Sequence, residues 1–356
     1  MQSVISGGAS RDAGAPGRIP VGRVRQGRTR SVRGIRLSVV TLLLAIAAAP
    51  ALARAQPTVR IAVLKFGTVS WVMDVIRHHG LDRANGIRIE TLGLAGTQAT
   101  LVALQAGRVD CAVSDWLWVS RQRAAGAHWT FFPFSTDLGA LVAARGAPIR
   151  DLADLRRRRL GIAGGPLDKS WVLLQALAAE QHIDLAREAR LSFGAPPLLN
   201  QELLNGHLDA VLTFWNFAAP LKSQGLPVVL SMRSALHQLG FKRPIPLVGY
   251  VVSGPWARAH PRALAGFVRA TREAEAILAT SNAEWQWLGR RTGARTPGEL
   301  IALRHGFRAG IPHHWGPAEQ REAEALYRLF ARVGGRQLVG TSATLQPGTF
   351  LATVRY

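Results

Sequence analysis

The sequence predicts an α/β protein made of two similar lobes, each with a mixed or parallel sheet flanked by helices. Short apolar strands alternate with helices in the first half of the chain, which is typical of parallel strands joined by crossover helices. A strand-and-turn pattern also recurs about 100 residues further along. The 356 residues are 48% hydrophobic and 19% charged, so the chain can bury a large core and is not a disordered protein. It has one cysteine, which cannot form an internal bridge, so it is not a disulfide scaffold either.

Three strands and two helices are predicted at the start of the first lobe. Runs of β-branched and aliphatic residues predict the strands Val59–Leu64, Ile87–Leu92 and Val109–Val113. The helices between them are expected at Ser70–His79 and Gln98–Ala106. Ser70 and Thr97 are the expected N-caps, because a hydroxyl group can accept a hydrogen bond from an amide of the first turn.

Two short motifs recur in the chain. Gly107-Arg108-Val109-Asp110 returns as Gly206-His207-Leu208-Asp209, and Ser70-Trp71-Val72 returns as Ser170-Trp171-Val172. The glycine suits the left-handed end of a helix, and the aspartate can accept hydrogen bonds from turn amides. The recurrence fits two similar lobes, but strand–helix–strand units also resemble one another in general.

The second half of the chain contains further strands and then becomes mostly helical. Leu160–Ala163 is a predicted strand, and Leu247–Ser253 is a strand expected to cross back into the first lobe. Apolar residues at helical spacing and local turn signals then predict helices at Arg262–Thr280, 283–290, 297–305 and 317–333.

The N-terminal segment is typical of a secretory signal peptide. A basic region precedes the apolar run Leu37–Ala49, and small-residue A-x-A patterns follow it, with cleavage expected after Ala55 or alternatively after Ala53. A membrane anchor is the competing interpretation, but the run is shorter than the ~20 residues of a spanning helix and is interrupted at Pro50. No cysteine lies near the cleavage site, so we expect a periplasmic protein that is not a lipoprotein. The basic region is long, so translation can also start downstream of Met1.

Export changes the meaning of the net charge of +22. Residues 1–55 hold nine arginines and one acid, which leaves 35 basic against 21 acidic residues, a net +14, in the mature chain. A periplasmic protein does not meet chromosomal DNA, so we expect no nucleic-acid partner. The single cysteine, Cys111, lies in an apolar strand and is expected in the core.

The mature chain resembles a known family in an ordered series of motifs. The strand Val59–Val63 is followed by the paired Gly-x-x-Asp motifs at 107–110 and 206–209. Between these motifs, Asp151-Leu152-Ala153-Asp154-Leu155 leads through four arginines to Leu160-Gly161-Ile162, and Gly249–Ser253 precedes His260-Pro261 and a long helix. This series is similar to the nitrate/sulfonate/taurine-type periplasmic binding proteins of ABC importers, a family whose branches include binders of thiamine-pyrimidine precursors. Arginine replaces the family's usual glycine in the turn before Leu160, a change expected to affect only the surface.

The resemblance implies a type II periplasmic-binding-protein fold with ligand held between two α/β lobes. We divide the chain into the signal segment 1–55, a discontinuous first lobe of 56–145 plus 248–356, and a second lobe of 146–247. The implied partners are a small-molecule solute and the permease and ATPase of an ABC importer, and we expect a monomer.

The candidate ligand-binding residues are those in loops that follow predicted strands, because open α/β sheets bind ligands at the carboxyl ends of their strands. They are Lys65, Phe66, Ser70, Trp71, Thr97, Gln98, Ser114, Asp115, Trp116 and Trp118 in the first lobe, and Asp168, Lys169, Ser170, Trp171, Trp215 and Asn216 in the second. Tryptophan faces suit planar or cationic groups, and helix N-termini suit anions. Each tryptophan can equally belong to the core, and each polar residue can be an ordinary helix cap. The set favours a small zwitterion or a polar heteroaromatic compound.

No catalytic residue, cofactor or metal site is predicted. The pairs His78-His79 and His313-His314 are adjacent residues, which do not share a helix face, and no Cys-x-x-Cys spacing, nucleophile elbow or P-loop is present. One member of the same fold family is a thiamine-pyrimidine synthase with a cysteine cluster, which this chain lacks. The sequence therefore favours an importer subunit over an enzyme, and leaves a ligand sensor that signals to a membrane partner as the alternative.

Overall fold

Ten strands form two five-stranded sheets in residues 56–356, the part of the chain that the computed structural model describes. The predicted signal segment, residues 1–55, lies outside the described residues. The first sheet has the order β2-β1-β3-β10-β4, with β1 parallel to β2 and β3, and β10 antiparallel to β3 and β4. Its strands are β1 (Thr58–Leu64), β2 (Arg88–Leu94), β3 (Cys111–Asp115), β4 (Trp129–Ser135) and β10 (Val248–Ser253).

The second sheet repeats the topology of the first. Its order is β7-β6-β8-β5-β9, with β6 parallel to β7 and β8, and β5 antiparallel to β8 and β9. The strands are β5 (Gly139–Ala143), β6 (Arg159–Ala163), β7 (Arg190–Gly194), β8 (Ala210–Phe214) and β9 (Val228–Ser231). Two mixed sheets confirm the predicted fold class, and all five strands predicted from the sequence lie within two residues of the observed bounds.

The recurring Gly-x-x-Asp motifs fold into the same structure in both halves. Asp110 accepts hydrogen bonds from the backbone N–H, Nε and Nη2 of Arg60, at 2.9, 3.0 and 2.7 Å. Asp209 accepts the same three bonds from Arg159, at 2.7, 3.2 and 2.7 Å. The glycine of each motif is left-handed, with φ of 68° at Gly107 and 76° at Gly206. Each aspartate therefore joins the amino end of one strand to its parallel neighbour, a role more specific than the predicted capping of turn amides.

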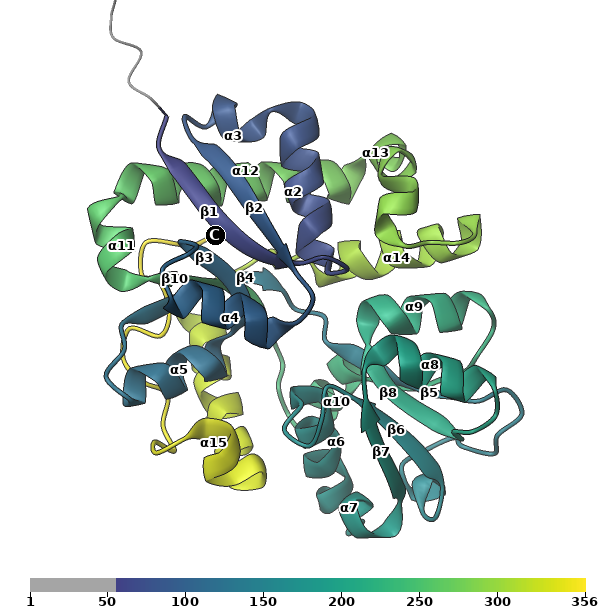
Figure 1. Ribbon diagram of the computed structural model, residues 1–356. Coiled ribbons are helices and arrows are strands. Elements are labelled where there is room, and N and C mark those ends of the chain that lie inside the picture. The colour runs from purple at the N-terminus through teal and green to yellow at the C-terminus, as the bar shows by residue number, and fades with distance from the viewer. Residues whose placement is uncertain (1–55) are drawn as a thin grey trace, which may run out of the picture. The chain divides into compact units, whose positions relative to one another are not determined.

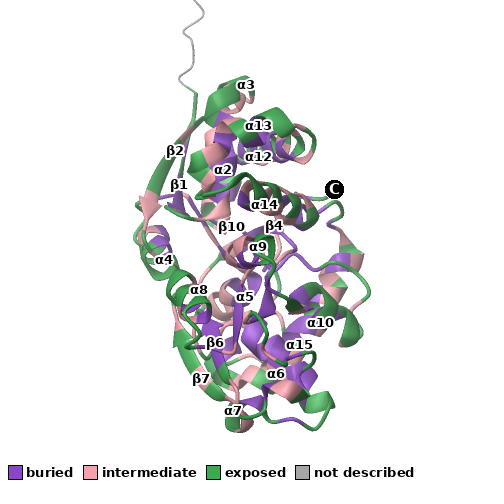
Figure 2. Ribbon diagram, turned by 90° about the vertical axis from the view of Figure 1, so that its right-hand side faces the viewer, coloured by how far each residue is buried: buried purple, intermediate pink, exposed green. Residues whose placement is uncertain are grey.

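Helices cover both faces of the first sheet (Figure 1). Residues alternate along β1, so that Val59, Ile61 and Val63 pack with the helices of one face and Ala62 faces the other. The helices around this sheet are α2 (Thr68–His79), α3 (Leu81–Ala84), α4 (Thr97–Gln105), α5 (Trp116–Ala124), α11 (Gly254–Ala259), α12 (Pro261–Thr280), α13 (Asn282–Leu288) and α14 (Pro297–Gly310), with a 3₁₀ turn at Gly289–Thr292. Figure 2 shows how their inner faces are buried, whereas the short helix α3 has no buried residue.

The second sheet is also covered on both faces. Helices α8 and α9 share one apolar cluster with it, and α6 and α10 belong to the cluster on its other face. The elements are α6 (Lys169–Glu180), α7 (Leu185–Glu188), α8 (Pro196–Leu204), α9 (Trp215–Ser223) and α10 (Met232–Gln238), with a 3₁₀ turn at Ala153–Leu155.

The last helix, α15 (Pro317–Val339), packs against α5 of the first lobe and α6 of the second. Its residues Tyr327 and Phe330 are fully buried and belong to one apolar cluster that also contains Trp116 and Trp171. The two lobes therefore share part of their core. Two predicted helices are longer than expected: α14 continues to Gly310, and α15 continues past a non-helical residue at Gly335 to Val339.

The chain passes from the first lobe to the second earlier than predicted. The sequence analysis placed this boundary between residues 145 and 146. Strand β5 lies in the predicted first lobe but hydrogen-bonds to β8 and β9 of the second sheet. The crossing segment is therefore Thr136–Leu138, between the end of β4 and the start of β5. The apolar composition of β5 suits either sheet, which is why the sequence could not place it.

Two expected N-caps are wrong. Helix α2 begins at Thr68 after Gly67, and Ser70 lies inside its first turn, where its hydroxyl donates to the carbonyl oxygen of Gly67. Helix α4 begins at Thr97 itself after Gly96. Both glycines are extended and provide no side-chain cap, so the first amides of α2 and α4 are left without a side-chain partner.

A buried carboxyl group on α12 makes stability depend on pH. Glu275 is 2% exposed and pairs with Arg272, whose Nη1 lies 3.0 Å from its Oε2. Burial outweighs the attraction of Arg272 and raises the pKa of Glu275 from 4.5 to about 7. Between these two pH values the folded chain holds a proton that the unfolded chain has lost, so this group's contribution to stability declines as the pH rises and is lost above about 7.

We predict that Glu275→Gln gains stability relative to the unmodified protein as the pH rises from about 4.5 to about 8, by up to about 3 kcal/mol. The amide cannot ionise, so the variant avoids the cost of burying the charge. Denaturant unfolding of both proteins at several pH values measures the difference. Glu273→Gln, an exposed change on the same helix, should show no such trend. A difference for Glu275→Gln that is the same at all pH values would contradict the prediction.

Candidate functional site

The carboxyl ends of the two sheets meet at an ion pair. Asp115 is the last residue of β3, and Lys169 is the first residue of α6, which follows β6. The Lys169 Nζ lies 2.7 Å from Asp115 Oδ2, and the side chains are 29% and 13% exposed. Two predicted site residues from opposite lobes are thus brought into direct contact.

Asp115 of this pair and the neighbouring Asp168 also cap helices. Asp115 accepts a hydrogen bond from the Trp118 N–H at 2.8 Å at the start of α5. Asp168 accepts from the N–H groups of Ser170 and Trp171 at the start of α6. Burial raises the pKa of Asp168, and the charge of Lys169 and these hydrogen bonds offset only part of that effect. For Lys169, burial lowers the pKa, but the attraction of Asp115 and Asp168 outweighs it, and the pKa of the ammonium group is raised. Lys169 therefore stays charged at neutral pH.

The five candidate tryptophans do not share one role. Trp71, Trp116 and Trp171 are at most 2% exposed and belong to the core. Trp116 lies among aromatic side chains and its Nε1–H donates to the Pro246 carbonyl oxygen at 3.0 Å. Trp118 is half-buried and packs on Trp129, with ring centroids 6.0 Å apart.

Trp215 is the candidate tryptophan that bridges the lobes. It starts α9, is half-buried, and meets the edge of Trp71 on α2 with ring centroids 6.0 Å apart. It also lies against Gly306 of α14, where an added Cβ would come within 2.7 Å of its ring. Figure 1 shows α9 and α14 side by side. The ring of Trp215 can approach α14 this closely because Gly306 has no side chain. Gly306 is a site residue that the sequence analysis missed, since nothing local distinguishes it from other helical glycines.

The first-lobe loops contribute the most exposed candidates. Phe66 is 80% exposed, Lys65 is exposed beside it, and the Lys65 N–H donates to the Leu94 carbonyl oxygen at 3.0 Å, which holds the β1–α2 loop against the end of β2. Thr97 and Gln98 are exposed at the uncapped start of α4. The N-termini of α2 and α4, both without a side-chain cap, therefore follow the neighbouring strands β1 and β2.

The remaining candidates are more deeply placed. Ser114 is 7% exposed within β3, Ser170 is 4% exposed within α6, and Asn216 is half-buried in the first turn of α9. Two surface cavities of about 570 and 480 Å³ lie elsewhere, the first along α12 and the C-terminal segment and the second between α13 and α14, and none of the predicted ligand-binding residues lines either of them.

Two further polar residues hold the lobes together and were not predicted. The Arg233 guanidinium of α10 donates to the Ala309 carbonyl oxygen of α14 at 2.7 Å. Asp137 lies in the crossing segment, where burial raises its pKa and the charge of Arg233 offsets part of this rise. An aspartate two residues after the apolar run of β4 was the signal that could have identified it.

Two mixed sheets of identical strand order that face each other at their carboxyl ends define the type II periplasmic-binding-protein fold. Solved structures share it: the alkanesulfonate-binding protein SsuA from Xanthomonas axonopodis pv. citri bound to MOPS has a TM-score of 0.65 at 16% identity, covering 83% of this chain and 99% of that one. The periplasmic aliphatic sulphonate binding protein SsuA from Escherichia coli has a TM-score of 0.63 at 18% identity, with 83% and 99% covered. The desulfurization enzyme DSZB also has the fold, with a TM-score of 0.55 at 14% identity, and 81% and 97% covered.

The sequence model of the NMT1/THI5-like family matches residues 76–282, more than half of the chain, and the protein belongs to that family. This assignment, together with the solved structures, confirms the predicted resemblance to nitrate/sulfonate/taurine-type binding proteins. No curated protein sequence matches the chain.

We predict that Lys169 and Asp115 are energetically coupled. In a double-mutant cycle with Lys169→Gln and Asp115→Asn, denaturant unfolding should give a coupling free energy of about 1–3 kcal/mol, because the pair is mostly withdrawn from water. The Arg88–Glu90 pair, whose side chains are 66% and 47% exposed, is the control and should give less than about 1 kcal/mol. Equal coupling in both cycles would contradict the importance of the interlobe pair.

Proposed function

We propose that the protein is the extracytoplasmic solute-binding subunit of an ABC importer and holds a small organic nitrogen or sulfur compound between its two lobes. The observation that carries this proposal is the 2.7 Å contact of Lys169 with Asp115. It places the loops at the carboxyl ends of both sheets opposite each other, where open α/β sheets bind ligands. The family assignment and the fold shared with two sulfonate-binding proteins support it.

The charges around this contact favour a ligand with both a cationic and an anionic group. Asp115 supplies a carboxylate, and Lys169 and Lys65 supply ammonium groups. The free amides at the starts of α2 and α4 are donors for an anionic group such as a sulfonate. A zwitterion such as taurine, or a polar heteroaromatic compound such as a pyrimidine, satisfies both sides better than an inorganic anion.

Two aromatic residues suit the organic part of such a ligand. Trp215 is half-buried at the lobe contact, and Phe66 is 80% exposed in the loop beside Lys65. An aromatic face contributes apolar area and, toward a cation, a favourable quadrupole. Trp71 packs against Trp215 from the core, and because Trp71, Trp116 and Trp171 are buried, none of them is a proposed ligand contact.

In the proposed mechanism no covalent bond changes. The lobes separate to admit the solute, the solute contacts both, and its preference for the closed form shifts the population toward that form, which then docks on the permease. The family fold also occurs in a desulfurization enzyme, but Cys111 is fully buried in β3 and burial raises its pKa well above the ordinary value, so it is not available as a nucleophile. A sensor that binds the same solute and signals to a membrane partner is the alternative.

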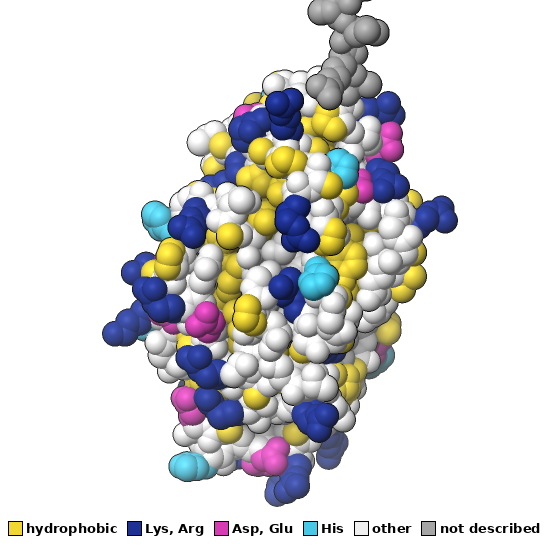
Figure 3. Space-filling model, turned by 90° about the vertical axis from the view of Figure 1, so that its left-hand side faces the viewer, with side chains coloured by type: hydrophobic (Ala, Val, Ile, Leu, Met, Phe, Trp, Pro, Cys, Tyr) yellow, Lys and Arg dark blue, Asp and Glu magenta, His cyan; other side chains and the backbone are white. Residues whose placement is uncertain are grey.

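The location and the partners follow from the same proposal. We propose a monomer exported by the cleavable segment that ends at Ala55. None of the helices in residues 56–356 has the length and hydrophobicity needed to span a membrane. Basic side chains on the face in Figure 3 are scattered among apolar and neutral groups. We propose no nucleic-acid partner.

We predict that taurine, another sulfonate, a pyrimidine or an organic amine raises the melting temperature of the protein, because a ligand of the native state alone must stabilise it. Thermal-shift measurements across these compounds and nitrate test this, with tryptophan fluorescence as a second signal. An absence of any effect across the panel, or turnover of a panel compound, would overturn the proposed function.

We predict that Trp215→Ala weakens binding of the compound identified in this way by at least about tenfold, because the change removes the aromatic surface shared by both lobes. Isothermal titration of the purified variant measures the loss. Trp256→Ala is the matched control, since Trp256 of α11 stacks on His260 just after that helix, away from the lobe contact, and its removal should leave the affinity unchanged. Equal affinities for both variants would exclude Trp215 from the site.

A further inference from the structure

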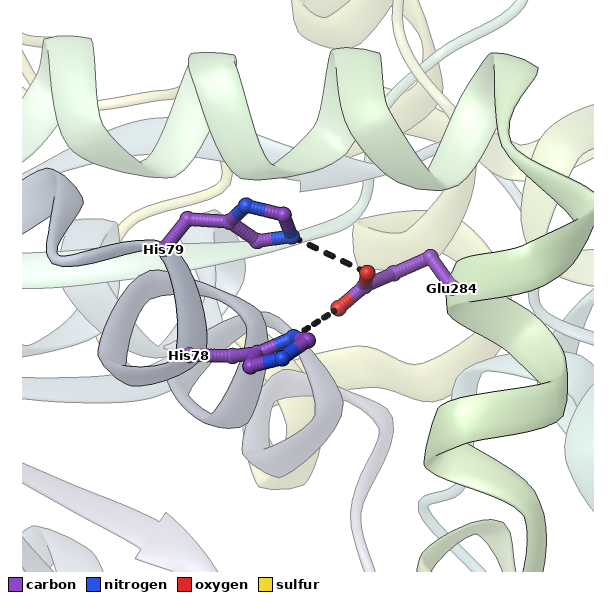
Figure 4. Close-up of side chains that lie close together, drawn as sticks. All are labelled: His78, His79 and Glu284. Carbon is purple, nitrogen blue, oxygen red and sulfur yellow. Dashed lines mark hydrogen bonds and ion pairs between the residues drawn. The ribbon is translucent and has the colours of Figure 1, made fainter.

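Three potential metal ligands converge at the far end of α2 from the lobe contact. His78 and His79 are the last two residues of α2, and Glu284 lies in the first turn of α13. His78 Nδ1 is 3.0 Å from Glu284 Oε1, and His79 Nε2 is 2.9 Å from Glu284 Oε2 (Figure 4). These ligand atoms all lie within 4.8 Å of one another, although Glu284 is 205 residues from His79 in the chain.

The spacing is close to what a metal ion requires. Zinc bonds to histidine nitrogen and carboxylate oxygen are about 2.0–2.2 Å long, which places neighbouring ligand atoms of a tetrahedral site about 3.3 Å apart. The observed separations of 2.9 and 3.0 Å, each to a different oxygen of Glu284, are a few tenths of an ångström shorter than this distance. All three ligand atoms lie within 4.8 Å of one another, so a bound ion would require small side-chain adjustments.

The carboxylate is held ready for a cation. The Glu284 side chain is 6% exposed, and its backbone N–H donates to the Ser281 hydroxyl at 3.1 Å, which fixes the start of α13. The C-terminal end of α2 adds a partial negative charge at the same place.

The histidine rings are positioned but still accessible. The His78 ring stacks on Trp287, with centroids 3.8 Å apart and planes 3° from parallel. Both histidine side chains are 38% exposed, so solvent reaches the side of the cluster opposite the buried carboxylate. Three protein ligands with one open side leave a fourth position for water or a small external ligand.

We propose that His78, His79 and Glu284 bind a divalent first-row transition metal ion of the zinc type. Two imidazole nitrogens and one carboxylate oxygen suit such ions, and softer or strictly oxygen-coordinated ions are disfavoured. The ion would join α2 to α13 and is independent of the solute proposed above. This departs from the sequence expectation: adjacent histidines cannot share a helix face, but at the last turn of α2 a carboxylate from another helix lies between them.

Zinc chloride added to the protein purified from the full chain without a histidine tag, after removal of metal with EDTA, tests the site. We expect one equivalent of zinc to bind in competition with a coloured chelator and to raise the melting temperature. The His78→Ala/His79→Ala variant should lose both effects. The matched control, His313→Ala/His314→Ala, removes the other exposed adjacent pair and should retain them.

A second variant keeps the test decisive if the double alanine variant fails to fold. His79→Gln leaves an amide donor for Glu284 but removes a strong ligand, and it should bind zinc at least about tenfold more weakly. Replacement of zinc by Co²⁺ adds a visible absorption spectrum that reports direct ligation. The proposal is overturned if the unmodified protein binds no zinc, or if His79→Gln and His78→Ala/His79→Ala bind it as tightly as the His313→Ala/His314→Ala control.

Discussion

The ion pair between Lys169 and Asp115 is the contact on which the arrangement of the two sheets depends. Asp115 ends the parallel strand β3, and Lys169 begins the helix α6. Withdrawal of both charges from water is costly unless they stay together, so the pair favours one relative position of the lobes. Two further contacts join the lobes. The Trp215 ring packs against Gly306, and Arg233 donates a hydrogen bond to the Ala309 carbonyl oxygen.

The other end of each sheet is fixed by arginine and not by contact between lobes. Asp110 with Arg60, and Asp209 with Arg159, tie parallel strands together at their amino ends in the same geometry. These contacts therefore stabilise the amino end of each sheet, which is opposite the end where the ligand is proposed to bind. The loops at the carboxyl ends differ in their charged residues: the first lobe offers Lys65 and Asp115, and the second offers Asp168 and Lys169.

Local pattern predicted the strands well because alternation and β-branched runs depend on neighbouring residues only. The helix starts at Ser70 and Thr97 were misplaced because an extended glycine began each helix one or more residues earlier, a choice that the hydroxyl pattern does not reveal. The site was predicted in part: Asp115 and Lys169 meet, but Trp116 and Trp171 are core residues. The sequence did not indicate that β5 joins the second sheet, that Gly306 contacts Trp215, or that Glu284 lies beside His79. Each of these depends on packing between segments far apart in the sequence.

Helix α15 has a consequence for the amplitude of any movement. It lies against α5 on one side and α6 on the other, and its Tyr327 and Phe330 are in the core cluster that both lobes share. A wide hinge opening would expose that apolar surface to water, at a free-energy cost that rises with every square ångström uncovered. Helix α15 thus connects the two lobes. Small sliding displacements of the lobes along this helix cost less free energy than a wide hinge opening.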